Sequence, residues 1–351
     1  MEIRRTPDLY PGSAPRGTAP RPVFLLPTTH NGPAPATRRA RAMIARAAAM
    51  VTAVTLGGCA GPGATDGALP PAPGRAAMST PAPTDRSPTA RLLAADVPIP
   101  KDAARIADAI KTTTRALRNA VDAWTRDGDT GAQPPKPAVL LALHQQRIYR
   151  YLARHPDLAR RVYDGLPAAL AKEAEENVTA IADLFSLTRP ISGSVKFRVQ
   201  PAEPAKVLLG YFQQAERRFG VEWEVLAAVM LVESVFGRVR SDSYAGAQGP
   251  MQFMPATWKA YGLGGDVRDP RDAVFGAANY LRASGAPRDY QRALHAYNPT
   301  QPYVNAVLLY ARQIKRDPRN YYAYYNWQVF VQTTKGDRRL TGPDPWRRRR
   351  P

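Results

Sequence analysis

The chain has 351 residues, enough for two modest domains with tails, and its 44% hydrophobic content is ordinary for a globular protein. Its formal net charge of +20, from 49 Lys and Arg against 29 Asp and Glu, suits an anionic polymer such as nucleic acid, lipid headgroups or a bacterial wall. No basic motif interleaved with aromatic residues is present, which argues against nucleic acid. A single cysteine excludes an intrachain disulfide framework. Four histidines without ligand spacing argue against a zinc hydrolase, so we expect no metal and no cofactor.

The N-terminal part of the chain carries signals of export. Proline, glycine, alanine, serine and threonine crowd it without hydrophobic periodicity. Arginines between positions 38 and 46 precede a weakly apolar run over 47–56, which is far shorter than the roughly 20 residues that span a bilayer but fits a secretory signal peptide. Leu56-Gly57-Gly58-Cys59 resembles the lipobox of bacterial lipoproteins, in which the cysteine becomes lipidated. An incidental cysteine is the alternative.

We therefore interpret residues 1–58 as an N-terminal extension with a lipoprotein signal peptide. Residues 59–97 are expected to be a disordered Pro/Ala-rich linker. These expectations place the protein in the cell envelope, exported and anchored by a lipid on Cys59 to the outer face of the cytoplasmic membrane or on the periplasmic side.

Helical periodicity begins near residue 101 and predicts a mainly α protein. Residues 98–195 are expected to form a helical bundle. Its first helix ends near Arg126, the second covers Val139 to Arg154, and two more begin at Pro156 and Pro167. The bundle's two histidines, at positions 144 and 155, are expected at the surface or at helix caps.

A second helical block is expected over residues 200–318. Its helices are predicted at 204–219, 222–236, 255–261, 273–284, 289–297 and 303–315, and Gly237 is expected to cap the second of them. Residues 327–333 alternate weakly and can turn back through Lys335-Gly336-Asp337, so the extension 319–343 is expected to hold a small β-hairpin. Residues 344–351 form a basic tail.

Glu233 lies on an apolar stripe of the helix predicted at 222–236, in line with Leu226, Val229 and Met230. Burial raises the pKa of a carboxyl group, and the negative end of the helix dipole adds to this effect. Both favour the protonated acid near neutral pH, which is the form that a general acid needs. The alternative is a solvated glutamate at a helix end.

The loop after Glu233 contains little side-chain bulk. Gly246, Ala247 and Gly249 allow a ligand to approach the backbone amides, while Ser243 and Gln252 can bind sugar hydroxyls or acetamides. An ordinary glycine-rich surface loop is the alternative.

The motifs together resemble the lytic transglycosylase domain of the goose-type lysozyme superfamily over about residues 203–315. They are Glu233-Ser234, Ser243, Gly246-Ala247, Gly249-Pro250-Met251-Gln252-Phe253-Met254-Pro255, Thr257-Trp258, Tyr297-Asn298 and Tyr303-Val304. The resemblance implies a lysozyme-like α fold and cleavage of peptidoglycan. It also implies Glu233 as the catalytic acid and five substrate-binding residues: Ser243, Met251, Gln252, Tyr297 and Asn298.

A single carboxylate suffices in this family, because the 6-hydroxyl of N-acetylmuramic acid attacks its own C1 and leaves a 1,6-anhydro end. Tyr297 can hold the carboxyl group or the acetamide. Four aspartates remain candidates for a second acid: Asp242, Asp266, Asp269 and Asp272. A hydrolytic lysozyme and a noncatalytic peptidoglycan-binding lipoprotein therefore stay open. The expected partners are glycan strands, the membrane through Cys59, and anionic wall polymers.

Overall fold

The computed structural model describes residues 94–126, 129–192 and 198–341. Residues 59–93 of the expected linker, with Cys59, and the basic tail lie outside these residues. The described part is mainly helical and ends in a two-stranded antiparallel sheet, as the sequence predicts. Its elements are α3 (Ala103–Arg126), α4 (Lys136–Leu152), α5 (Pro156–Asp164), α6 (Ala168–Ser186), α7 (Ala205–Phe219), α8 (Trp223–Ser234), α9 (Pro255–Tyr261), α10 (Pro270–Ser284), α11 (Tyr290–Tyr297), α12 (Gln301–Arg316), α13 (Arg319–Tyr325), β1 (Val329–Thr333) and β2 (Gly336–Leu340).

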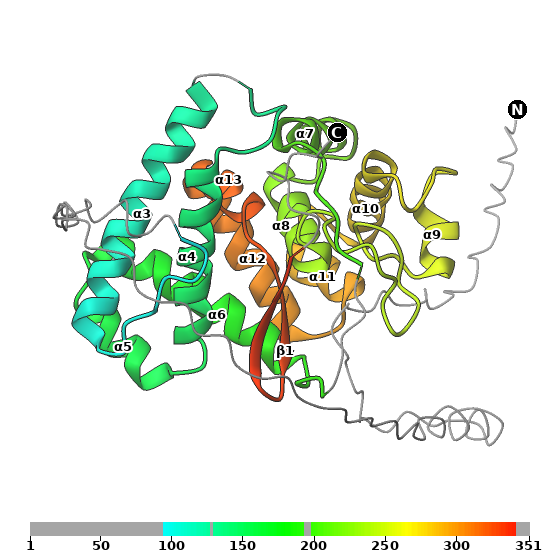
Figure 1. Cartoon of the computed structure of the whole chain (residues 1–351). Coiled ribbons are helices and arrows are strands. Elements are labelled where there is room, and N and C mark those ends of the chain that lie inside the picture. The colour runs from blue at the N-terminus through cyan, green and yellow to red at the C-terminus, as the bar shows by residue number, and fades with distance from the viewer. Residues whose placement is uncertain (1–93, 127–128, 193–197, 342–351) are drawn as a thin grey trace, which may run out of the picture. The chain divides into compact units, whose positions relative to one another are not determined.

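Helix α8 is the central element because it is apolar on every side. It packs against α7, α10, α12 and α13, and α12 in turn packs against α6 (Figure 1). The helices predicted as a separate bundle and those of the second block belong to one compact unit and share one hydrophobic core. Glu233 is thereby carried on a helix that its neighbours hold from several directions.

The end of α8 differs from the prediction. The helix stops at Ser234, and its C-cap is Val235 with φ of 52°, so Gly237 is not the cap. Phe236 and Gly237 are also left-handed, with φ of 59° and 76°. A left-handed conformation is costly for a β-branched residue such as Val235, so tertiary contacts must hold this turn.

Two further local features escaped the sequence patterns. Helix α13 was not predicted, and its tyrosines Tyr321, Tyr324 and Tyr325 are buried in the shared core. His144 is buried rather than at the surface, and burial lowers its pKa to about 4. His155 does occupy the N-cap position of α5, as expected.

The β-hairpin has Val329 opposite Leu340 and Thr333 opposite Gly336. On the edge of β1 that does not pair with β2, Thr333 forms a parallel bridge with Ile191. The hairpin therefore connects the C-terminal extension with the segment that follows α6. None of the described helices is both long and apolar enough to cross a bilayer.

Candidate active site

Glu233 lies in the last turn of α8 and is 2% exposed. Burial raises the pKa of its carboxyl group to about 8, although a hydrogen bond from Tyr303 opposes this effect. The Tyr303 hydroxyl donates to Glu233 Oε1 at 2.9 Å. The other oxygen, Oε2, is buried and has no hydrogen-bond partner among the described residues. Glu233 is thus a neutral acid at pH 7 with one oxygen available to a ligand.

Ser234 ties the left-handed turn after α8 to the loop that follows it. Its hydroxyl donates to the carbonyl oxygen of Pro250 at 2.5 Å and accepts from the amide of Gly237 at 2.8 Å. Because Ser234 adjoins Glu233 and is 1% exposed, these two bonds fix the position of the acid relative to residues 249–252. The sequence places Ser234 in the motif but does not reveal this bridging role.

The loop predicted to bind substrate is closed by its own hydrogen bonds. Ser243 donates its amide to the carbonyl oxygen of Ala247 at 2.8 Å, and its hydroxyl accepts from the Ala247 amide at 2.9 Å. Gly249 has φ of 72°, and a Cβ there would lie 1.8 Å from the carbonyl oxygen of Val267. Glycine is therefore required at this position by the neighbouring chain as well as by its own conformation.

Gln252 is a left-handed non-glycine residue, with φ of 50°, and is 1% exposed. Its Nε2 donates to the carbonyl oxygen of Gly249 at 2.9 Å, while its Oε1 is buried without a partner among the described residues. A strained backbone and an unpartnered buried oxygen are features that concentrate in binding sites.

Tyr297 does not hold the acid, contrary to one option from the sequence. Its hydroxyl donates to the carbonyl oxygen of Met251 at 2.7 Å, and it is Tyr303 that bonds to Glu233. The rings of Tyr297 and Tyr303 stack with centroids 6.4 Å apart and an interplanar angle of 5°. Tyr297 therefore supports Tyr303 and the Met251 segment. The sequence motif contains Tyr303 but does not reveal this role.

Met251 and Asn298 complete the predicted set of site residues. Met251 is fully buried, whereas Asn298 is 5% exposed and follows α11 directly. The Asn298 side-chain oxygen accepts from the hydroxyl of Thr300 at 2.9 Å. The hydrogen bond from Tyr297 to Met251 connects the end of α11 to the loop before α9. The structure thus links these residues to the turn that carries Glu233.

The four candidate second acids have other partners. Asp242 pairs with Arg268 through bonds of 2.9 and 3.0 Å. Asp266 accepts from the amide of Arg268. Asp269 caps α10 by accepting from the Asp272 amide, and Asp272 accepts from the amide of Asp266. Both interactions are structural, as expected for helix-start residues.

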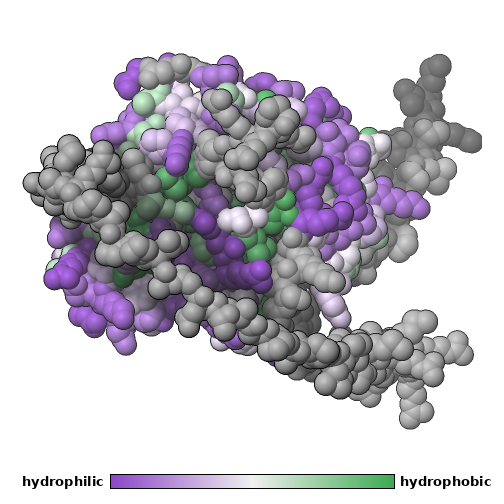
Figure 2. All heavy atoms as spheres, viewed as in Figure 1, coloured by the Kyte–Doolittle hydropathy of each residue, from purple (hydrophilic) through white to green (hydrophobic). Residues whose placement is uncertain are grey.

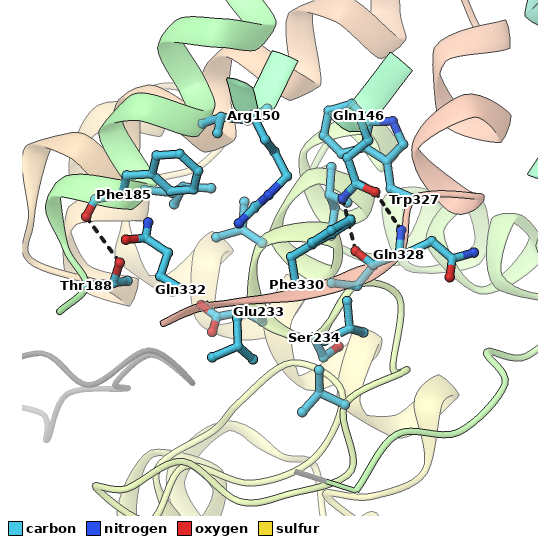
Figure 3. Close-up of a pocket in the computed structure, with 18 of the residues that line it drawn as sticks. Gln146, Arg150, Phe185, Thr188, Glu233, Ser234, Trp327, Gln328, Phe330 and Gln332 are labelled. Atoms are coloured by element: carbon cyan, nitrogen blue, oxygen red, sulfur yellow. Dashed lines mark hydrogen bonds between the residues drawn. The ribbon is translucent and has the colours of Figure 1, made fainter. Parts of the chain in front are cut away.

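A pocket of about 140 Å³ opens beside Glu233. One wall comes from α8 and the turn after it, and the other from β1, α4 and the end of α6, with Arg150, Phe185, Phe330 and Gln332 among its side chains (Figure 3). Glu233 is the only carboxylate among the described lining residues. On the face seen in Figure 2, hydrophobic residues gather in the middle of the described part and hydrophilic residues border them.

Comparison with known proteins agrees with this geometry. Residues 210–317 match the family model described as the transglycosylase SLT domain. No solved structure matches the chain. The match covers α8 to α12 and includes all six of the predicted catalytic and substrate-binding residues, but α3 to α6 and the β-hairpin lie outside it. No group of three or more potential metal ligands occurs within the described ranges.

Proposed function

The chain carries a transglycosylase SLT domain at residues 210–317, a domain type that acts on peptidoglycan, and on this basis we propose that it is a lytic transglycosylase with Glu233 as its general acid and base. The bond cleaved is the β-1,4 linkage between N-acetylmuramic acid and N-acetylglucosamine. The observation that carries the proposal is the buried carboxyl group of Glu233, whose pKa is raised to about 8 and whose Oε2 has no hydrogen-bond partner in the part of the chain that the structure describes.

The reaction needs one protein carboxyl group. Glu233 donates its proton to the bridging oxygen as the bond from C1 to that oxygen breaks. The acetamido group of the substrate stabilises the positive charge that develops at C1. The 6-hydroxyl oxygen of the same muramic acid then bonds to C1, and its proton goes to the Glu233 carboxylate. The products are a free 4-hydroxyl on glucosamine and a 1,6-anhydro end, the acid is restored, and no water is consumed.

The surroundings of Glu233 support this route over hydrolysis. Most glycosidases use two carboxyl groups that flank the scissile bond. Here Asp242 is paired with Arg268, and no second carboxylate lines the described part of the pocket. A nucleophile supplied by the glycan removes the need for a second acid.

Product analysis tests the proposal. Purified peptidoglycan is incubated with the full chain and the muropeptides are analysed by mass spectrometry. We expect 1,6-anhydro ends; reducing ends would identify a hydrolytic lysozyme, and binding without any product would identify a noncatalytic wall-binding protein. Glu233→Gln should abolish turnover, whereas the same replacement of Glu224 in the first turn of α8 should leave turnover in place.

The cellular location is part of the same proposal. Residues 1–58 direct export and Cys59 carries a lipid, which places the enzyme where its substrate lies. The support is the lipobox-like sequence before Cys59 and the net charge of +20, which also suits anionic wall polymers. Labelling of cells with a radioactive fatty acid should mark the protein but not its Cys59→Ala variant. Equal labelling of both would contradict the anchor.

A further inference from the structure

The β-hairpin is firmly anchored to helix α4. Gln146 on α4 binds Gln328 through two hydrogen bonds, from Nε2 to the carbonyl oxygen at 3.0 Å and from the Gln328 amide to Oε1 at 2.9 Å. Arg150, one turn further along, binds Asp337 on β2 at 2.7 and 2.9 Å. Its guanidinium group also lies 4.8 Å from the ring centroids of both Phe185 and Phe330. These contacts hold β1 in a defined register beside the pocket (Figure 3).

The other edge of β1 is held as well. The amide of Ile191 donates to the carbonyl oxygen of Gln332 at 2.9 Å, and the amide of Thr334 donates to the carbonyl oxygen of Ile191 at 3.2 Å. Gln332 therefore has its backbone fixed on both sides, since it also lies opposite Asp337 on β2. A side chain on such a rigid backbone can be aimed at a ligand with little loss of entropy on binding.

The side-chain amide of Gln332 has no hydrogen-bond acceptor among the described residues. Along β1, Val329 and Val331 are buried, whereas Phe330 and Gln332 are partly exposed, as alternation on a strand dictates. The side-chain nitrogen of Gln332 is buried and makes no hydrogen bond within the described part of the chain. Because an unpaired buried donor is costly, this amide is poised to bind an acceptor atom.

The opposite wall of the pocket carries Glu233 and indicates which ligand supplies the acceptor atom for Gln332. Gln332 and Glu233 line the same cavity, so a ligand that presents a glycosidic oxygen to Glu233 passes β1 (Figure 3). Each sugar of the glycan carries an N-acetyl group, whose carbonyl oxygen accepts hydrogen bonds and whose methyl group suits the apolar lining. Resting on the function proposed above, we propose that the hairpin forms a substrate subsite in which Gln332 binds the N-acetyl carbonyl oxygen of a sugar next to the scissile bond.

A double-mutant design with altered substrate tests this role. Two proteins are compared, Glu233→Gln, which does not cut glycan strands, and the double variant Glu233→Gln with Gln332→Ala. For each protein, the dissociation constants of N-acetylated and of chemically N-deacetylated glycan fragments are measured. We expect Gln332→Ala to weaken binding of the N-acetylated glycan about three- to tenfold, the effect of one neutral hydrogen bond. Binding of the deacetylated glycan should change by less than about twofold, because the bond is already absent.

Gln328→Ala is the matched control. It removes the same side chain next to β1, at a position drawn away from Gln332 in Figure 3, and it should not discriminate between the two glycans. An equal effect of Gln332→Ala on both glycans, or none on either, would overturn the subsite. This test is independent of the test of the proposed function. If Gln332 binds the N-acetylated glycan selectively but the wild-type protein cuts no peptidoglycan, the subsite is retained and the proposed enzymatic activity is rejected.

Discussion

Replacement of Glu233 by glutamine should stabilise the protein, and the gain should grow with pH. The folded protein keeps the Glu233 proton up to about pH 8, while the unfolded chain releases it near 4.5. Below pH 4.5 both states are protonated and the shift has no effect. Between these pH values ionisation of the carboxyl group lowers the free energy of the unfolded state but not that of the folded state. The free energy of unfolding of the wild type therefore falls as pH rises.

The magnitude follows from the size of the shift. Each unit between the two pKa values costs about 1.36 kcal/mol, so the free energy of unfolding of the wild type should fall relative to Glu233→Gln by about 3 kcal/mol between about pH 5 and pH 7.5. Glu233 is only 2% exposed, so solvent screens its carboxyl group little. Comparing the two pH values cancels any constant effect of the amide on packing.

Urea unfolding of both proteins across this pH range measures the difference. Glu175→Gln is the control: it makes the same replacement on an exposed face of α6 and should give a curve parallel to that of the wild type within about 0.5 kcal/mol. Parallel curves for the wild type and Glu233→Gln would refute the reasoning, because they would mean that Glu233 ionises in the folded protein as readily as in the unfolded chain.

Three further substitutions probe the support of the acid. Tyr303→Phe removes the hydrogen bond that lowers the pKa of Glu233, so the alkaline limb of the kcat/KM profile should move above pH 8 while kcat falls; a limb at lower pH would contradict this. Ser234→Ala leaves two buried backbone groups unpaired and should cost about 1–3 kcal/mol in urea unfolding, whereas a neutral effect would remove Ser234 from the positioning of the acid. Gly249→Ala places a Cβ 1.8 Å from a carbonyl oxygen and should lower stability by at least about 2 kcal/mol and reduce turnover; unchanged melting would show that the loop can shift freely.

Several elements of the fold could be read from local chemistry. Helix α9 was predicted with its observed bounds because Pro255 starts it, and α7 ends at Phe219, the last residue of the helix predicted there. Helix α13 was missed although Tyr321, Tyr324 and Tyr325 have the i, i+3, i+4 spacing of a helix, because a segment of 7 residues is too short for this pattern to be distinguished from a loop. The hairpin was predicted from one turn, but the turn lies at Thr334 and Lys335 rather than at residues 335–337, and the edge partner Ile191 lies far away in the sequence.

The sequence by itself predicted that Glu233 is buried and that the pKa of its carboxyl group is raised, since the residue lies on an apolar stripe of its helix, and burial disfavours charge. It also contained the motif that surrounds the acid. Only the tertiary structure decided which phenol bonds to the carboxyl group. The sequence offered Tyr297, but the packing of α11 and α12 places the Tyr303 hydroxyl on Glu233 and the Tyr297 hydroxyl on Met251. The tertiary structure also decided that β1 forms the far wall of the pocket, because contacts between segments more than a hundred residues apart are set by the packing of the core and by no local pattern.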